Sequence, residues 1–104
     1  MVVNSKRPLP LSKNEAIDTC RKYLSDGNLT WTPHLKKRMD ERNISIRDVI
    51  NAIEVGKIAK TPEWNAESGE YSYLVKGKDI EGANLTVRVA ISEETEMLTL
   101  ITVY

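Results

Sequence analysis

The sequence predicts an α+β protein whose N-terminal helices pack on one face of a small antiparallel β-sheet. The first observation is a change in the spacing of apolar residues near Gly56, from the period of about 3.6 that is typical of helices to the period of about 2 that is typical of strands. The second is that the helix-capping signals we identify all precede this residue. A chain of 104 residues fits one domain, which we place at residues 12–104 after a flexible N-terminal arm of residues 1–11.

The first two predicted helices begin at residues that cap helix N-termini. Ser12 opens a capping box with the sequence Ser-Lys-Asn-Glu, which predicts a helix over 13–25 that stops at Gly27. Thr32 is followed directly by proline, which is favoured at the first position of a helix because its missing N–H would have no partner there. This pair predicts a second helix over 33–43.

The third predicted helix has the clearest amphipathic pattern. Ser45 begins a second capping box and Gly56 stops the pattern, which places this helix over 46–55. Its apolar residues recur at the i, i+3, i+4 and i+7 spacing of one helix face. These residues are Ile46, Val49, Ile50 and Ile53. We interpret residues 28–31 as a link between the first two helices.

Three strands are predicted where apolar and polar residues alternate, over 70–76, 84–92 and 97–104. The connections between them are too short for a parallel crossover, so we expect an antiparallel meander. A fourth strand, at the edge of the sheet, is expected over 57–61. Pro62 is expected to end it, because proline cannot donate to a strand ladder.

Strand alternation also predicts which side chains lie on the open face of the sheet, away from the helices. Polar residues are expected together on this face, namely Lys76, Arg88, Thr102 and Tyr104. Three leucines are expected there too, namely Leu74, Leu98 and Leu100. The helix-covered face is expected to hold Val87, Val89, Ile101 and Val103. Arg88 is the most informative of these residues, because a charged side chain in the middle of a central strand needs a specific reason.

Composition and charge restrict the classes of function. Fifteen basic residues balance 15 acidic ones, so no overall field draws the chain to nucleic acid and any such site must be a local patch. Cys20 is the only cysteine, which excludes an internal disulfide and fits a reducing compartment. The N-terminus lacks the apolar core of a signal peptide, and no segment approaches the roughly 20 apolar residues of a membrane span. We therefore expect a cytoplasmic protein that does not engage a membrane.

The chain's only histidine, His34, lies on the second predicted helix. Arg38 and Arg42 follow it at four-residue intervals, so the three side chains share one helix face. A histidine titrates near neutral pH and an arginine can hold a phosphate by paired hydrogen bonds, so this face suits proton transfer beside a phosphodiester. The ordinary alternative is a surface or capping histidine with two arginines in solvated ion pairs. One histidine and one cysteine supply too few ligands for a metal site.

A longer pattern runs through the second and third helices and into the last strand. It reads His34-x3-Arg38-Met39-x2-Arg42-x-Ile44-Ser45-x2-Asp48-Val49-x6-Gly56, followed by strands that end in Thr102-Val103-Tyr104. From Trp31 to Tyr104 this pattern resembles domain-of-unknown-function family 4258. The preceding helix and the LTWTPHL junction are similar in layout to MqsR-like toxins. Both groups resemble the RelE-type fold, in which helices cover one face of a small antiparallel sheet and the other face cuts RNA.

The resemblance implies a metal-independent endoribonuclease, the toxin of a bacterial toxin–antitoxin pair. It implies RNA as substrate, including mRNA on the ribosome, and a zinc-finger antitoxin as partner. His34 would move the proton of a ribose 2′-hydroxyl, while Arg38 and Arg88 stabilise the phosphoryl oxygens. The residues expected to position the RNA are Lys76, Thr102, Tyr104 and Arg42.

No cofactor is expected for this reaction, because the nucleophile belongs to the substrate. Two alternatives stay open at this point. One is a non-catalytic protein-interaction module with the three leucines of the open face at its centre. The other is a domain that binds RNA without cleaving it.

Overall fold

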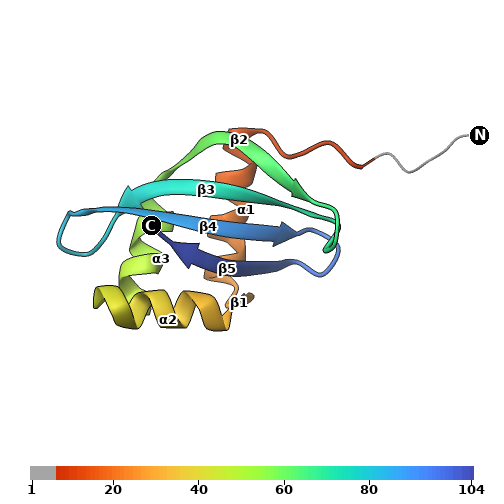
Figure 1. The fold of residues 1–104 in the computed structure, drawn as a ribbon. Helices are drawn as coiled ribbons and strands as arrows, with labels where there is room; N and C mark the ends of the chain where they lie inside the picture. The colour runs from red at the N-terminus through yellow and green to blue at the C-terminus, as the bar shows by residue number, and fades with distance from the viewer. Residues whose placement is uncertain (1–6) are drawn as a thin grey trace, which may run out of the picture.

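The computed structural model describes residues 7–104, which form three helices and a five-stranded sheet. The helices are α1 (Lys13–Ser25), α2 (Pro33–Arg42) and α3 (Ile46–Val55). The strands are β1 (Leu29–Trp31), β2 (Lys57–Asn65), β3 (Glu70–Lys78), β4 (Asn84–Ser92) and β5 (Met97–Val103). In Figure 1, α1 and α3 lie behind the sheet and α2 runs beside β5, so one face of the sheet is left open. The predicted α+β class, with helices on one face, is confirmed.

The sheet is mixed, with the strand order β1-β5-β4-β3-β2. The strands from β2 to β5 pair antiparallel, as predicted for the last three. The expectation of a purely antiparallel sheet is wrong, because the segment interpreted as a link forms β1, which pairs parallel to β5 with Thr30 opposite Thr99. Three residues are too few to show an alternating pattern, so this strand has no detectable signal in the sequence.

The predicted helix starts are confirmed by their capping contacts, and the second helix ends at Arg42, one residue earlier than predicted. Ser12 and Ser45 each accept a hydrogen bond from the backbone N–H three residues later, and the acidic side chain at that position accepts one from the serine N–H. Asn43 ends α2 in the left-handed conformation, with φ 55°. No helix among the described residues is both long and apolar enough to cross a bilayer.

The end of α3 lies very close to the sheet, and two glycines make this possible. A Cβ atom placed on Gly77 of β3 would lie 2.0 Å from the carbonyl oxygen of Ala52, and one on Gly56 would lie 2.4 Å from the same oxygen. Neither position accepts a side chain unless the backbone moves. The close approach packs α3 onto β3 and β4, with Ile53 completely buried between them.

The chain before α1 is attached to the tyrosines of β3. The hydroxyl of Tyr71 donates to the carbonyl of Pro8 over 2.6 Å, and the N–H of Leu11 donates to the hydroxyl of Tyr73 over 3.0 Å. Residues 1–6 of the predicted arm lie outside the described residues. The part of the arm nearest to α1 is therefore fixed to the same strand that carries part of the open face.

β2 is longer than predicted and contains Pro62 instead of ending at it. A register shift between Ala59 and Glu63 removes the proline from the ladder, and pairing with β3 then continues to Asn65. Within the shift, Lys60 has φ 60°, a left-handed conformation that a residue with a side chain rarely adopts. Proline is tolerated at bulges and in edge strands, where its missing N–H breaks no ladder bond. The expectation that Pro62 ends the strand is wrong for this reason.

The alternation predicted for β5 is wrong in the first part of the strand. Arg88 lies opposite Thr102, but the next residue of β4 lies opposite Leu100, which leaves Ile101 as an extra residue in β5. Because side-chain direction alternates, one extra residue moves every residue before it to the other face. Leu98 and Leu100 are therefore completely buried, and Ile101 lies on the open face beside Arg88.

The other predictions of side-chain direction are confirmed. The valines expected on the helix-covered face are completely buried, namely Val87, Val89 and Val103. Leu74 lies opposite Arg88 on the open face. The protein-interaction alternative needed three leucines on this face, and two of them are in the core. Leu74 and Ile101 remain on the open face, and Trp64 and Tyr71 line its groove.

Candidate functional site

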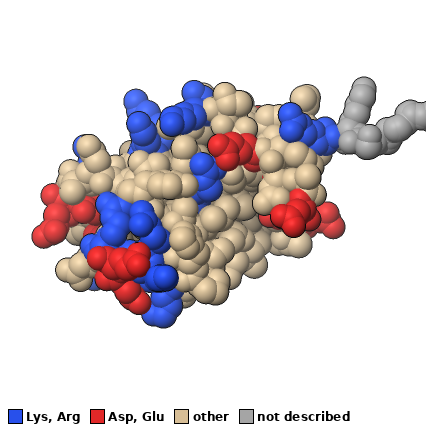
Figure 2. All heavy atoms as spheres, viewed as in Figure 1, with Lys and Arg blue, Asp and Glu red and all other residues tan. Residues whose placement is uncertain are grey.

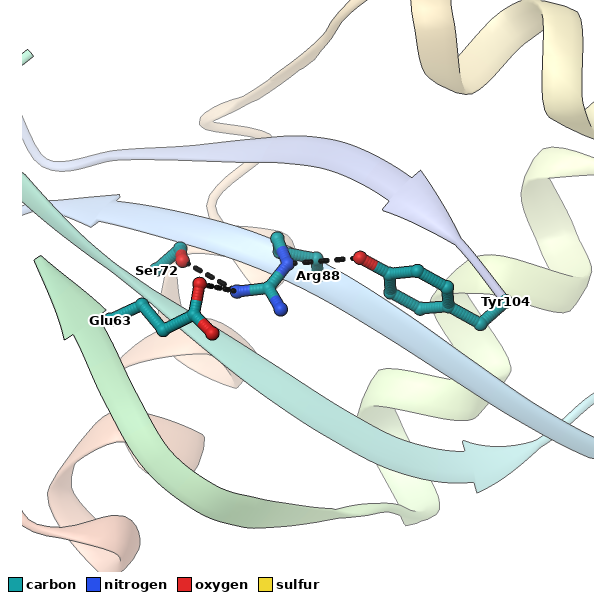
Figure 3. Close-up of polar contacts among 4 residues, drawn as sticks. All are labelled: Glu63, Ser72, Arg88 and Tyr104. Carbon is teal, nitrogen blue, oxygen red and sulfur yellow. Dashed lines mark hydrogen bonds and ion pairs between the residues drawn. The ribbon is translucent and has the colours of Figure 1, made fainter. Parts of the chain in front are cut away.

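Arg88 lies at the centre of the open face, at the midpoint of the central strand β4. Its Nε donates to the hydroxyl of Tyr104 over 3.1 Å and its Nη1 donates to the hydroxyl of Ser72 over 2.8 Å. Nη1 also lies 3.4 Å from a carboxylate oxygen of Glu63 (Figure 3). Only 18% of the Arg88 side chain is exposed. The guanidinium is thus held in one position by groups from β2, β3 and the residue after β5.

This arrangement keeps hydrogen-bond donors for a ligand. Nη2 of Arg88 makes no hydrogen bond to the described residues, and Figure 3 shows it pointing away from the three partner groups. The hydroxyl of Tyr104 accepts from Arg88 and still has its own O–H to donate. An anionic oxygen beside Nη2 would therefore meet a charged donor. The chemistry available here is anion binding by a preorganised guanidinium.

Backbone contacts set the position of Tyr104. Its N–H donates to the carbonyl of Thr86 over 2.9 Å, which extends the pairing of β5 with β4 by one residue. The preceding carbonyl, that of Val103, accepts from Nε and Nη2 of Arg38, each over 3.4 Å. Arg38 thereby links α2 to the end of β5. In this structure its contact is structural, and it adds positive charge next to Tyr104.

Thr32 fixes the bulge of β5 from the other side. Its Oγ1 donates to the carbonyl of Ile101 over 2.7 Å and accepts from the N–H of Leu35, as the N-cap of α2. One hydroxyl therefore joins the start of α2 to the extra residue of the strand. Thr102, the next residue, lies opposite Arg88 and is 7% exposed. Its backbone is held on both sides, by the contact of Thr32 with Ile101 and by that of Arg38 with Val103.

A groove of about 660 Å³ adjoins Arg88 on the open face. A cross-strand row contributes to its lining, namely Ser72, Ala90 and Thr99. The turn between β2 and β3 and the strand ends beside it also line the groove, and this side supplies three carboxylates, those of Glu63, Glu67 and Glu70. Within the described part of the chain, Arg88 is the only cation that lines the groove. A ligand in this groove would meet positive charge at Arg88 and negative charge at the turn.

The helix-borne candidates lie outside this groove. His34 is exposed in the first turn of α2 and does not line the groove. It precedes Arg38 by one helical turn on the same helix face. Arg42 is exposed in the last turn of the helix. The structure thus brings Arg38 to the end of β5 but leaves His34 and Arg42 on the surface of α2.

Lys76 lies on the open face in the row next to that of Arg88. It is exposed and sits between Thr86 of β4 and Lys57 of β2, which are its partners in the neighbouring strands. Two lysines are therefore adjacent at this end of the face. Among the predicted site residues, the structure gathers Arg88, Thr102 and Tyr104 at one point, with Lys76 nearby.

Basic side chains flank the middle of the open face. Figure 2 shows this face, with Lys and Arg side chains over α2 and along the β2 side of the sheet. Acidic side chains are interspersed over α2 and gather at the ends of the strands, and one acidic group lies beside a basic one in the upper middle of the face (Figure 2). Although the net charge of the chain is zero, basic side chains gather on both sides of the sheet centre.

Two residues that hold Arg88, Ser72 and Glu63, are not among those predicted from the sequence. Ser72 had a usable signal, because it shares the alternation that places Lys76 on the open face. Glu63 had none, because it follows the proline that was expected to end the strand. Only the register shift in β2 explains its position.

Metal-binding and thiol chemistry have no support among the described residues. Within residues 7–104, no group of three or more His, Cys, Asp or Glu side chains is arranged to hold a metal ion. Cys20 is completely buried, and this burial raises the pKa of its thiol to about 12. A buried thiol of this kind is not a nucleophile at neutral pH. What the groove offers is the guanidinium of Arg88 with its free hydrogen-bond donors, together with the carboxylates of Glu63, Glu67 and Glu70.

Comparison with known proteins identifies the family of the chain. Residues 31–104 match the family described as "Domain of unknown function (DUF4258)". No curated protein and no solved structure matches the chain. The matched region begins in β1, excludes α1, and contains every residue of the Arg88 site. Because the match covers well over half of the sequence, this protein belongs to the DUF4258 family.

Proposed function

We propose that this protein is an endoribonuclease that binds single-stranded RNA on the open face of its sheet and cleaves it without a metal ion. The observation that carries the proposal is the fixed guanidinium of Arg88 at the centre of a helix-free face, with Nη2 free to bind an anion. A guanidinium binds a phosphate through two parallel hydrogen bonds. The resemblance to RelE-type and MqsR-like toxins, whose open sheet face cuts RNA, supports the same function.

The nucleophile in the proposed reaction is the ribose 2′-hydroxyl. Its oxygen forms a bond to the adjacent phosphorus while its proton passes to a base. The bond from phosphorus to the 5′-oxygen breaks and that oxygen takes up a proton, which leaves a 2′,3′-cyclic phosphate and a 5′-hydroxyl. Arg88 would stabilise the additional negative charge on the phosphoryl oxygens, and the O–H of Tyr104 would donate to the same oxygens.

His34 is the proposed proton acceptor. It lies one helical turn from Arg38, whose guanidinium binds the carbonyl of Val103, next to Tyr104. For this step the 2′-hydroxyl next to the phosphate on Arg88 must lie within hydrogen-bond distance of the His34 ring. Because His34 does not line the groove of Arg88, the proposal requires bound RNA to bring α2 and this nucleotide together.

More distant basic residues would position the strand. Lys76 lies beside the Arg88 row, and Arg42 lies in the last turn of α2, on the helix face of His34. Contacts of this kind with phosphates release counterions, so RNA binding should weaken as the salt concentration rises. Thr102, opposite Arg88, would support the bound phosphate through its fixed backbone.

The biological role we propose is that of the toxin of a bacterial toxin–antitoxin pair. Its substrates would include mRNA on the ribosome, and its partner would be an antitoxin, of the zinc-finger class that the resemblance implies. An antitoxin that covers the open face would block access to Arg88. Inhibition would then follow from occlusion of the site alone.

The test is cleavage of a defined RNA by the full chain in the presence of a chelator, with and without ribosomes, together with a growth assay. We expect products that end in a cyclic phosphate. Arg88→Ala and His34→Ala should each lower the rate by about 100-fold or more, because each removes a group that acts in the transition state. Arg47→Ala is the matched control, because Arg47 is exposed on α3, behind the sheet.

The outcomes separate the parts of the proposal. RNA that stays intact both free and on ribosomes, with no growth arrest, would contradict it. Cleavage at an unchanged rate in His34→Ala would keep the activity and remove His34 from the site. Binding without cleavage would assign RNA binding alone to the open face.

A further inference from the structure

The contact between Glu63 and Arg88 places a carboxylate at the position where an anionic ligand would bind. Glu63 Oε1 lies 3.4 Å from Nη1, one of the two terminal nitrogens of the guanidinium (Figure 3). The side chain of Glu63 is 72% exposed, whereas that of Arg88 is 18% exposed. A largely exposed acidic group therefore approaches a mostly buried cation from the solvent side.

The register shift in β2 brings this carboxylate to Arg88. If the pairing of the first half of β2 continued without a break, Thr61 would lie opposite Ser72. The shift places Glu63 there instead, and Ser72 is the residue whose hydroxyl binds the same Nη1. Lys60 adopts φ 60° within the shift. An irregular and strained segment thus exchanges a neutral side chain for an acidic one beside Arg88.

The contact is weak enough to be replaced by a ligand. Its length exceeds the roughly 2.7–2.9 Å of a strong charge-assisted hydrogen bond. An ion pair whose acidic partner is largely in solvent contributes little to stability. A phosphate can engage Nη1 and Nη2 together, and Nη2 has no bond to the described residues. The phosphate and Glu63 therefore compete for the same edge of the guanidinium.

We propose that Glu63 occupies the anion position of Arg88 in the free protein and weakens anion binding until it is displaced. This rests on the proposed function in so far as the anion is an RNA phosphate, although the competition applies to any phosphate. Removal of the carboxylate should strengthen phosphate binding about two- to fivefold, the range set by the loss of a solvent-exposed ion pair.

The experiment compares Glu63→Gln with Glu67→Gln in the full chain. Glu67 is exposed and lines the same groove, but it makes no ion pair with Arg88 in the described structure. Both variants lose the same charge, so they differ in the contact with Arg88. One probe is inorganic phosphate, followed through the NMR signal of the Nε–H of Arg88. The other is a 2′-O-methyl oligoribonucleotide, which lacks the nucleophile, followed by fluorescence anisotropy.

We expect Glu63→Gln to bind both probes about two- to fivefold more tightly than the wild type, and Glu67→Gln to bind like the wild type. In an Arg88→Ala background, Glu63→Gln should no longer affect oligonucleotide binding. Equal effects of Glu63→Gln and Glu67→Gln would overturn the proposal, because they would show a general effect of charge. Unchanged or weaker phosphate binding in Glu63→Gln would overturn it too. Tighter phosphate binding without oligonucleotide binding would support the competition and count against RNA as the ligand.

Discussion

Replacing Gly77 by alanine tests whether the backbone of α3 packs directly on the sheet. The new methyl group would lie 2.0 Å from the carbonyl oxygen of Ala52, and 2.7 and 2.8 Å from its carbonyl carbon and Cα. Carbon and oxygen atoms rarely approach closer than about 3.3 Å, so the gap must widen by roughly 1.3 Å. All three opposing atoms belong to backbone, so no side-chain rotation relieves the clash.

The expected cost follows from what has to move. Adding a methyl group to a packed core costs about 1–3 kcal/mol where the surroundings adjust by small shifts. Here α3 itself must retreat and withdraw Ile53 from the core, so we expect a loss of about 3 kcal/mol or more in the free energy of unfolding. A domain of this size has about 5–15 kcal/mol in total. Gly77→Ala should therefore remove a large part of the stability.

Gly27→Ala is the control, because it separates steric clash from backbone strain. Gly27 has φ +77°, and nothing lies within 4 Å of the position that a methyl group would take, so alanine there meets only the left-handed penalty of about 1–2 kcal/mol. Urea denaturation followed by tryptophan fluorescence measures both free energies of unfolding. If Gly77→Ala costs no more than Gly27→Ala, α3 is free to move away from the sheet and the reasoning is refuted.

Two further predictions concern stability. Ile53→Ala should lower the free energy of unfolding by about 2–5 kcal/mol, because Ile53 is 0% exposed and its truncation leaves a cavity; a loss below about 1 kcal/mol in chemical denaturation would contradict this. The N–H groups of Ser45 and Ile80 donate to Asp48 and lower the pKa of its carboxyl. This stabilisation is present above about pH 4, the pKa of the Asp48 carboxyl in the unfolded chain. It is lost as the pH falls through the lower pKa that the carboxyl has in the folded protein. Asp48→Asn should therefore have a lower free energy of unfolding than the wild type at pH 7, and denaturation at several pH values should show this difference shrinking below about pH 4. A difference that stays the same at every pH would contradict the prediction.

The helices could be predicted because their signals are local. A capping serine and the acidic residue three positions later contact each other within one turn, so Ser12 and Ser45 locate helix starts without knowledge of the rest of the fold. The same holds for β4, which alternates without interruption and therefore reveals the direction of Arg88. A pattern that depends only on a few neighbouring residues can be read from the sequence, because contacts with distant segments do not alter it.

The parts that could not be predicted depend on contacts between distant segments. β1 exists because β5 is beside it, and the bulge at Ile101 is held by the hydroxyl of Thr32, 69 residues earlier in the chain. No glycine or proline marks that bulge in the sequence. The position of Glu63 depends on a register shift that begins before Pro62. The bulge and the register shift change which side chains surround Arg88.

The two irregular strands determine what the open face can bind. With unbroken pairing of β4 and β5, Leu100 would lie opposite Ala90, next to Arg88, and the face would be an apolar surface of the kind that protein partners use. The bulge at Ile101 turns Leu100 into the core and places Thr99 opposite Ala90 instead. The groove around the guanidinium has both polar and apolar lining, since Ser72, Thr99 and Glu63 line it together with Trp64, Tyr71 and Ile101. The departures from regular pairing thus place Thr99 and Glu63, where regular pairing would place Leu100 and Thr61, in the row next to that of Arg88, and they set Ile101 beside Arg88 on the open face.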